Sequence, residues 1–167
     1  MQACEVCGYE WDAVAADEIP GRLRRGADAF GAVLAGDPAN FAERPDPDTW
    51  SIALYCSHTR DVVLNLRDRI VCGLAEDNPT PKAIFSDVRI ENGVYAADTA
   101  DRLQVELDVA AGLLARLVEA LDDARLARPI FYPWPRPETR TLLWVASQAL
   151  HEVEHHLTDV QRLAAAG

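Results

Sequence analysis

Three of the four histidines in this chain lie in one stretch near its end, at His151, His155 and His156. His151 and His155 are four residues apart, a spacing that places two side chains on the same face of an α-helix about one turn apart. Two imidazoles so placed can bind one metal ion. We therefore treat His151 and His155 as candidate ligands, against the commoner alternative that such a pair is a surface or half-buried feature.

The remaining histidine, His58, is the candidate for a third ligand. It falls on or beside the apolar face of a second expected helix. Three imidazoles on rigid helices leave one coordination position open for water or substrate. We therefore predict a mononuclear centre of His58, His151 and His155. His156 projects about 100° away from His155, so we expect it at the surface or as a hydrogen-bonding neighbour, with replacement of His151 as the alternative.

A second set of candidate ligands lies at the start of the chain, where Cys4 and Cys7 form a single C-x-x-C motif before Gly8. A zinc ribbon needs a second such motif, which the chain lacks. Three interpretations stay open: a zinc site completed by Cys56 or a histidine, a dithiol that exchanges with disulfides, or two unmetallated thiols on a mobile terminus. In a further variant the motif covers the bundle and donates Cys4 or Cys7 to the histidine centre, which would make that centre structural.

Four helices are predicted to position these residues, because apolar side chains recur at spacings of three and four along four stretches. These stretches cover about residues 20–35, 48–73, 99–126 and 141–163, and the second begins with Asp48 or Thr49 as its cap. The prediction is an all-α protein whose domain, residues 19–167, is a four-helix bundle. Residues 1–18 precede it as an N-terminal C-x-x-C segment.

The connections between these helices also carry information. The stretch 77–97 is longer than antiparallel neighbours need, and it can run the length of a helix. We therefore expect the second and third helices to be parallel and joined by a long crossover, with a short turn of strand at 88–90. Residues 127–137 contain four prolines, which exclude a helix and predict an extended segment over the bundle.

Composition narrows the function. The chain has 167 residues, 49% of them hydrophobic and 26% charged, which predicts one packed domain. The formal net charge of −11 argues against nucleic-acid binding, because a phosphate backbone would be repelled. Neither a membrane-spanning run nor a signal peptide is evident, so we expect a cytoplasmic protein with reduced cysteines.

Two motifs together resemble the DinB family, also called the DinB/YfiT-like metalloenzymes, and its actinobacterial members in particular. The second helix is preceded by Asp48-Thr-Trp-Ser51 and carries His58, and the last carries Leu-His-Glu-Val-Glu-His-His-Leu-Thr-Asp-Val at 150–160. The resemblance covers about residues 20–165. It implies a bundle with up-down-down-up helix order and a divalent metal, often zinc or nickel, bound by one histidine of the second helix and two of the last. By position these are His58, His151 and His155.

The resemblance also implies an activity. Characterised members are thiol transferases that use mycothiol, bacillithiol or related cofactors, including a maleylpyruvate isomerase. The iron enzymes of ergothioneine synthesis continue the last motif as H-x-x-x-H-x-E, but the equivalent position here is Leu157. We therefore expect a metal-dependent, mycothiol-type S-transferase or isomerase that acts on a small molecule. The oligomeric state stays open, although members of the family are often homodimers. The alternatives are hydrolysis by a metal-activated water and a non-catalytic metal- or ligand-binding bundle with a structural or sensory site.

Overall fold

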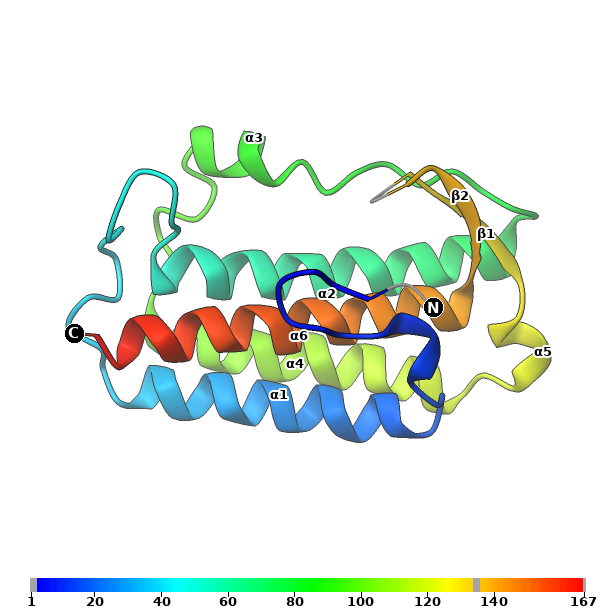
Figure 1. Ribbon diagram of the computed structural model, residues 1–167, viewed down its shortest axis with the longest axis horizontal. Coiled ribbons are helices and arrows are strands. Elements are labelled where there is room, and N and C mark those ends of the chain that lie inside the picture. Colours follow the sequence, from blue (N-terminus) through cyan, green and yellow to red (C-terminus); the bar gives the residue numbers. More distant parts are fainter. Residues whose placement is uncertain (1–2, 134–135, 167) are drawn as a thin grey trace.

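Four long helices pack side by side around a shared apolar core in the computed structural model, which describes residues 3–133 and 136–166 (Figure 1). The four are α1 (Glu18–Ala35), α2 (Ile52–Ala75), α4 (Ala100–Glu119) and α6 (Leu142–Ala164). The four-helix bundle predicted from apolar spacing is therefore confirmed. Within the two described ranges, none of the helices has the length and apolarity that crossing a bilayer requires.

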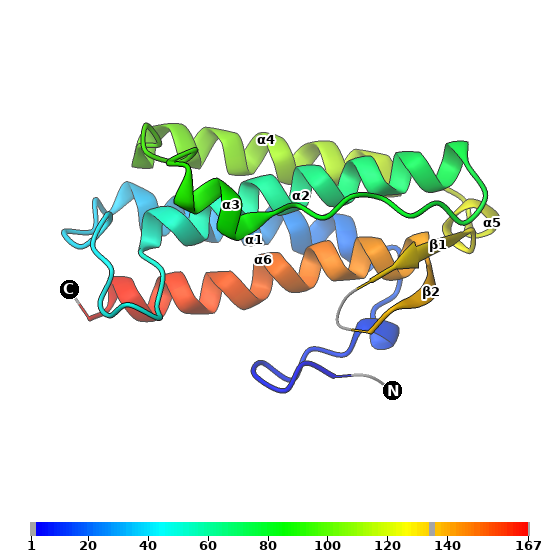
Figure 2. The same ribbon diagram turned by 90° about the horizontal axis from the view of Figure 1, so that it is seen from above.

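The helices form a ring in which α1 and α2 each pack against α4 and α6. The colours of Figure 1 run in one direction along α2 and α4 and in the opposite direction along α1 and α6. The chain between α2 and α4 therefore has to travel back along the bundle. Figure 2 shows this connection passing beside α2 and carrying the short helix α3 (Ser86–Glu91). The prediction of a short strand at 88–90 was wrong, because these residues belong to α3. The amide of Asn92 donates to the carbonyl of Val88, four residues earlier, as in an α-helix.

Two helix boundaries also differ from the prediction. The cap of α2 is Ser51, whose Oγ accepts a hydrogen bond from the Leu54 amide at 3.2 Å. Asp48 and Thr49 instead lie in a turn, where the Asp48 amide donates to Oδ1 of Asp46. The third predicted helix is two helices, because Asp122 caps a new one, α5 (Asp123–Leu126), by accepting from the Arg125 amide.

The proline-containing segment is extended, as predicted, at Pro129–Tyr132, where it forms a strand, and its residues 134 and 135 lie outside the described part of the chain. Strand β1 (Pro129–Tyr132) pairs antiparallel with β2 (Glu138–Thr141), and Ile130 lies opposite Arg140. The hairpin leads directly into α6, whose first turn is capped by the Oγ1 of Thr141. The start of α6 is thus fixed against the bundle.

The N-terminal segment lies along the outer side of α6 (Figure 2). It contains one turn of 3-10 helix, η1 (Trp11–Ala13), and its Tyr9 and Trp11 are buried in the same core as the long helices. The Tyr9 hydroxyl donates to the carbonyl of Ser147 at 2.9 Å. The Ser147 hydroxyl in turn donates to the carbonyl of Trp11 at 2.9 Å. A division of the chain at residue 18 stays a prediction.

Gly26 of α1 allows the close approach of α1 and α6, and we expect Gly26→Ala to destabilise the fold. A Cβ atom there would lie 2.3 Å from Cγ1 of Val153, a buried β-branched side chain with little freedom to move. Overpacking of this kind costs about 1–3 kcal/mol, which outweighs the roughly 1 kcal/mol by which alanine favours a helix over glycine.

Urea unfolding followed by circular dichroism would measure the change in the free energy of unfolding. The matched control is Gly112→Ala in α4, because a Cβ there meets only the guanidinium end of Arg116 at 3.4 Å. That variant should be neutral or stabilised by up to about 1 kcal/mol. Equal stabilisation by both substitutions would contradict the close contact.

Candidate metal centres

The last helix carries its metal-ligating side chains in two neighbouring rows. His151 and His155 form one row, with ring centroids 5.2 Å apart. Glu152 and His156 form the other, with Oε2 and Nε2 3.3 Å apart. Each pair is spaced by four residues, and the rows are rotated by about 100° because each residue turns the helix by that angle. The predicted pairing of His151 with His155 on one face is thus present, but the rows face different partners.

The first site, which we call the histidine–glutamate cluster, consists of His58, Glu152 and His156. Their ligand atoms all lie within 4.8 Å of one another. Oε2 of Glu152 lies 3.6 Å from Nε2 of His58 and 3.3 Å from Nε2 of His156. His58 is 7% exposed, and the ring of Trp50 covers it with centroids 5.1 Å apart. A helix-to-helix contact between α2 and α6 therefore brings three potential ligands to one point.

Neighbouring polar groups orient all three side chains of this cluster. Nδ1 of His58 forms a hydrogen bond with Oγ of Ser86 at 3.2 Å, and Nδ1 of His156 bonds to Oδ2 of Asp159 at 3.2 Å. Both Nε2 atoms are thereby left directed at Glu152. Gln148 donates from Nε2 to the other carboxylate oxygen, Oε1, at 2.6 Å. Such outer partners fix ring orientation and tautomer in metal sites.

The charges in this cluster suit a cation. Burial opposes ionisation of Glu152, but hydrogen bonds from His156 and His58 more than offset it and hold its pKa well below the usual range. Burial also opposes ionisation of His156, which lowers its pKa, but hydrogen bonds to Asp159 and Glu152 outweigh burial and raise the pKa of His156 to about 9. In the metal-free protein a proton on His156 therefore balances the carboxylate at neutral pH. A divalent cation would take the place of that proton.

A cavity of about 290 Å³ borders the histidine–glutamate cluster. His58 and Glu152 form part of its wall, and most of the remaining lining is apolar, including Val62, Leu66, Ile84 and Tyr132. One cation also lines it: Arg69, only 7% exposed, lies over the Tyr132 ring at 4.9 Å and donates from Nη2 to the carbonyl of Lys82. Among the described residues, the buried Nε of Arg69 has no hydrogen-bond partner.

The second site, which we call the cysteine–histidine cluster, consists of Cys4, Cys7, His151 and His155. Their four ligand atoms also lie within 4.8 Å of one another. Tyr9 packs against the His151 ring with centroids 5.2 Å apart. His151 is 4% exposed, and neither of its ring nitrogens has a hydrogen-bond partner among residues 3–133 and 136–166.

The structure therefore groups the predicted site residues differently from the sequence-based prediction. His58 lies close to His156, the residue considered as a replacement for His151 among the metal ligands. Among the described residues, no close group of ligand atoms contains His58 together with His151 and His155. Joint binding of one metal by His58, His151 and His155 stays a prediction. Cys4 and Cys7, considered as a separate site or as donors to the histidine centre, adjoin His151 and His155.

Two residues of the candidate site, Glu152 and Arg69, were not identified from the sequence. Glu152 was not among the ligands predicted from the sequence. The signal that could have found it is its four-residue spacing from His156, the same spacing that marks the histidine pair. Arg69 offered no comparable signal, because it falls between Leu66 and Ile70 in the apolar stretch of α2.

Comparison with known proteins agrees with the four-helix bundle. The sequence model of the DinB superfamily matches residues 22–160. The fold is similar to YfiT from Bacillus subtilis, described as a probable metal-dependent hydrolase with an unusual four-helix bundle topology; the TM-score is 0.80 at 16% identity, over 93% of this chain and 90% of that one. No curated protein matched the sequence. Because the family match spans most of the chain, the protein belongs to the DinB superfamily.

Proposed function

We propose that the protein is a metal-dependent enzyme whose His58, Glu152 and His156 bind a divalent metal, zinc or nickel in the first instance. The observation that carries this proposal is the convergence of three ligand atoms at the wall of a cavity. Two imidazoles and one carboxylate form the ligand set of many catalytic zinc and non-haem iron sites, which keep positions open for substrate. This set differs from the three-histidine set that the family resemblance implied, which stays a prediction.

The same proposal takes the helix order to be up-down-down-up, as in the resembling family. The common direction of α2 and α4 in Figure 1 supports it. With that order α2 and α6 are antiparallel neighbours, and their packing supports a centre built from both helices. The ligands then lie on rigid elements, which hold a site more accurately than loops do.

A divalent metal at this point would act as a Lewis acid that lowers the pKa of a thiol or a water in the open position. The chain's own residues prepare the site. Ser86 and Asp159 hold the two imidazoles, and Gln148 turns Oε2 of Glu152 toward them. The apolar wall excludes bulk water, which strengthens electrostatic interactions in the cavity.

Arg69 indicates the class of substrate. It is the cation among the residues that line the cavity, and its Nε has no hydrogen-bond partner in the described part of the chain. A buried guanidinium attracts carboxylate or phosphate groups. A cavity of about 290 Å³ limits the bound group to a small molecule. We therefore propose a small electrophile with an anionic group.

Two reactions fit this centre. The first is attack by a low-molecular-weight thiol of the mycothiol type, in a transferase or isomerase acting in the cytoplasm; the family resemblance supports it. The second is attack by water, and the similarity to YfiT, described as a probable hydrolase, supports it. The two reactions differ in what occupies the open position. A spectroscopic test of sulfur coordination separates them.

We expect that adding mycothiol to the cobalt-substituted protein produces a sulfur-to-cobalt charge-transfer band, because the thiol binds as thiolate. The experiment uses the Cys4→Ser/Cys7→Ser variant, so that only the added thiol supplies an accessible sulfur near the metal. His156→Ala in that background should abolish the band. If no band develops at any thiol concentration, the transferase is excluded and hydrolysis becomes the better proposal.

We also expect Glu152→Gln to weaken metal binding at this centre by at least about tenfold, because it removes the ionised oxygen from between the two imidazoles. Glu154→Gln is the matched control on the same helix, since Glu154 pairs with Arg22 instead. Competition with a metal-binding dye, in the Cys4→Ser/Cys7→Ser background, measures the affinity. Equal losses in both variants, or none in either, would show that Glu152 is not a ligand.

A further inference from the structure

Residues 3–10 fold into a tight loop that carries two cysteines. Ala3 and Glu10 form an isolated antiparallel bridge, and the Gly8 amide donates to the carbonyl of Cys4 at 2.8 Å. The amide of Cys4 donates to the carbonyl of Tyr9, also at 2.8 Å. Gly8 has φ of +73°, a conformation that glycine adopts without steric cost. Backbone hydrogen bonds therefore hold the C-x-x-C motif in a defined turn.

Backbone amides of this loop, those of Val6 and Cys7, are directed at the Cys4 sulfur. Amides directed at a cysteine sulfur stabilise the negative charge that metal ligation requires. The loop brings this sulfur and that of Cys7 to His151 and His155.

Three of the four ring nitrogens on the histidine side of the cluster lack a hydrogen-bond partner in the described part of the chain. His151 is 4% exposed, and within the described ranges both of its ring nitrogens are without a hydrogen bond, as is Nδ1 of His155. Each unsatisfied buried polar atom costs about 1–3 kcal/mol. Neutral imidazole is the form that binds metal.

The distances agree with a small closure around one ion. In tetrahedral zinc sites, sulfur at about 2.3 Å and nitrogen at about 2.0 Å place ligand atoms roughly 3.3–3.8 Å from one another. The four ligand atoms of the cysteine–histidine cluster already lie within 4.8 Å of one another. Two cysteines and two histidines are a common ligand set of structural zinc sites, in which four protein ligands leave no open position.

We infer that Cys4, Cys7, His151 and His155 bind one zinc ion in a closed structural site that attaches the N-terminal segment to α6. Binding releases the two thiol protons and forms two zinc–sulfur and two zinc–nitrogen bonds, without any change in oxidation state. This site is distinct from the histidine–glutamate cluster, with which it shares no ligand. It also extends beyond the family match, which begins at residue 22.

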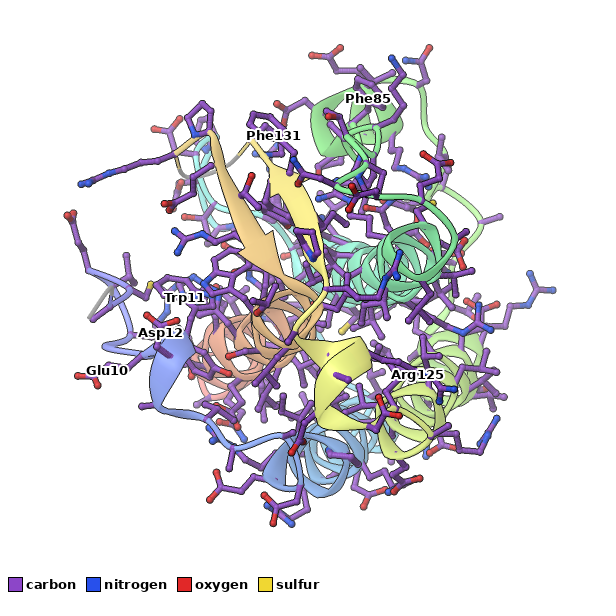
Figure 3. All side chains as sticks on the ribbon, turned by 90° about the vertical axis from the view of Figure 1, so that its right-hand side faces the viewer. Glu10, Trp11, Asp12, Phe85, Arg125 and Phe131 are labelled. Carbon is purple, nitrogen blue, oxygen red and sulfur yellow. The ribbon has the colours of Figure 1, made fainter. Side chains whose placement is uncertain are left out.

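The inferred zinc site has a consequence for the histidine–glutamate cluster. The segment that it attaches includes Trp11, which Figure 3 labels on the N-terminal segment. The indole Nε1 of Trp11 donates to Oε1 of Gln148. Because the indole can only donate, it fixes which end of the Gln148 amide remains for Glu152. The amide nitrogen of Gln148 then donates to Oε1 of Glu152 at 2.6 Å. The zinc site thus supports the orientation of a ligand in the other cluster.

Elemental analysis of the untagged full chain, purified with added zinc, tests the inference. The His58→Ala/His156→Ala variant should keep one zinc per chain, because the cysteine–histidine cluster is intact. Adding Cys4→Ser and Cys7→Ser should remove that zinc, whereas Cys72→Ser in place of these two should not. Retention of the zinc after loss of both cysteines would overturn the inference, and so would its absence from the His58→Ala/His156→Ala variant.

A second measurement needs no substitution, which matters because variants of the buried His151 can fail to fold. Native mass spectrometry of the wild-type chain should show a zinc adduct in which Cys4 and Cys7 resist alkylation, because both sulfurs bind the ion. Removing that zinc with a chelator should speed amide hydrogen exchange in residues 3–14 by at least about tenfold. Unchanged exchange, or an oxidised Cys4–Cys7 pair in place of the adduct, would contradict a structural zinc.

These results separate the inference from the proposed function. Failure of the proposed function would appear as no metal at His58, Glu152 and His156 while the cysteine-dependent zinc persists. Failure of the inference would appear as metal that depends on His58 and His156 but is indifferent to Cys4 and Cys7.

Discussion

The buried carboxylate of Glu152 is the constraint on which the rest of the site depends. An ionised carboxylate removed from water costs several kcal/mol unless opposite charge and hydrogen bonds surround it. Here the surroundings come from α2 and α6: His58 from α2, His156 from the next turn of α6, and Gln148 from the preceding turn, which is itself held by Trp11. Loss of His156 would remove the balancing charge, and loss of Gln148 would leave Oε1 of Glu152 without this hydrogen bond.

The periodicity of one helix explains how two sites can coexist. A helix of 3.6 residues per turn brings every fourth residue back to nearly the same direction, and adjacent residues diverge by about 100°. In α6 the row of His151 and His155 faces the N-terminal segment, while the row of Glu152 and His156 faces α2. The row of His151 and His155 lies close to two more potential ligands, Cys4 and Cys7. The row of Glu152 and His156 lies close to one, His58, at the wall of the cavity. A metal bound by the first row would therefore be closed by protein ligands, and one bound by the second would keep an open position.

The sequence predicted the helices well because their apolar spacing is a local property, and it identified the metal-ligating residue types. It could not decide which row of α6 faces His58. That depends on the rotation of α6 about its axis, which is fixed by contacts such as that of Val153 with Gly26 of α1. The sequence also could not predict that Cys4 lies close to His151. The two residues are separated by nearly the whole length of the chain, and no local pattern indicates such a contact.

The two clusters are close neighbours, because the rings of His155 and His156 have centroids 5.0 Å apart. Two divalent cations at such a spacing would repel each other strongly unless their ligands neutralise them. Two thiolates from Cys4 and Cys7 would balance the charge of a zinc ion in the cysteine–histidine cluster. Glu152 and Asp159 would together balance the second ion, with Asp159 accepting from Nδ1 of a neutral His156. The anionic groups around the two clusters are therefore sufficient for both to be filled at once.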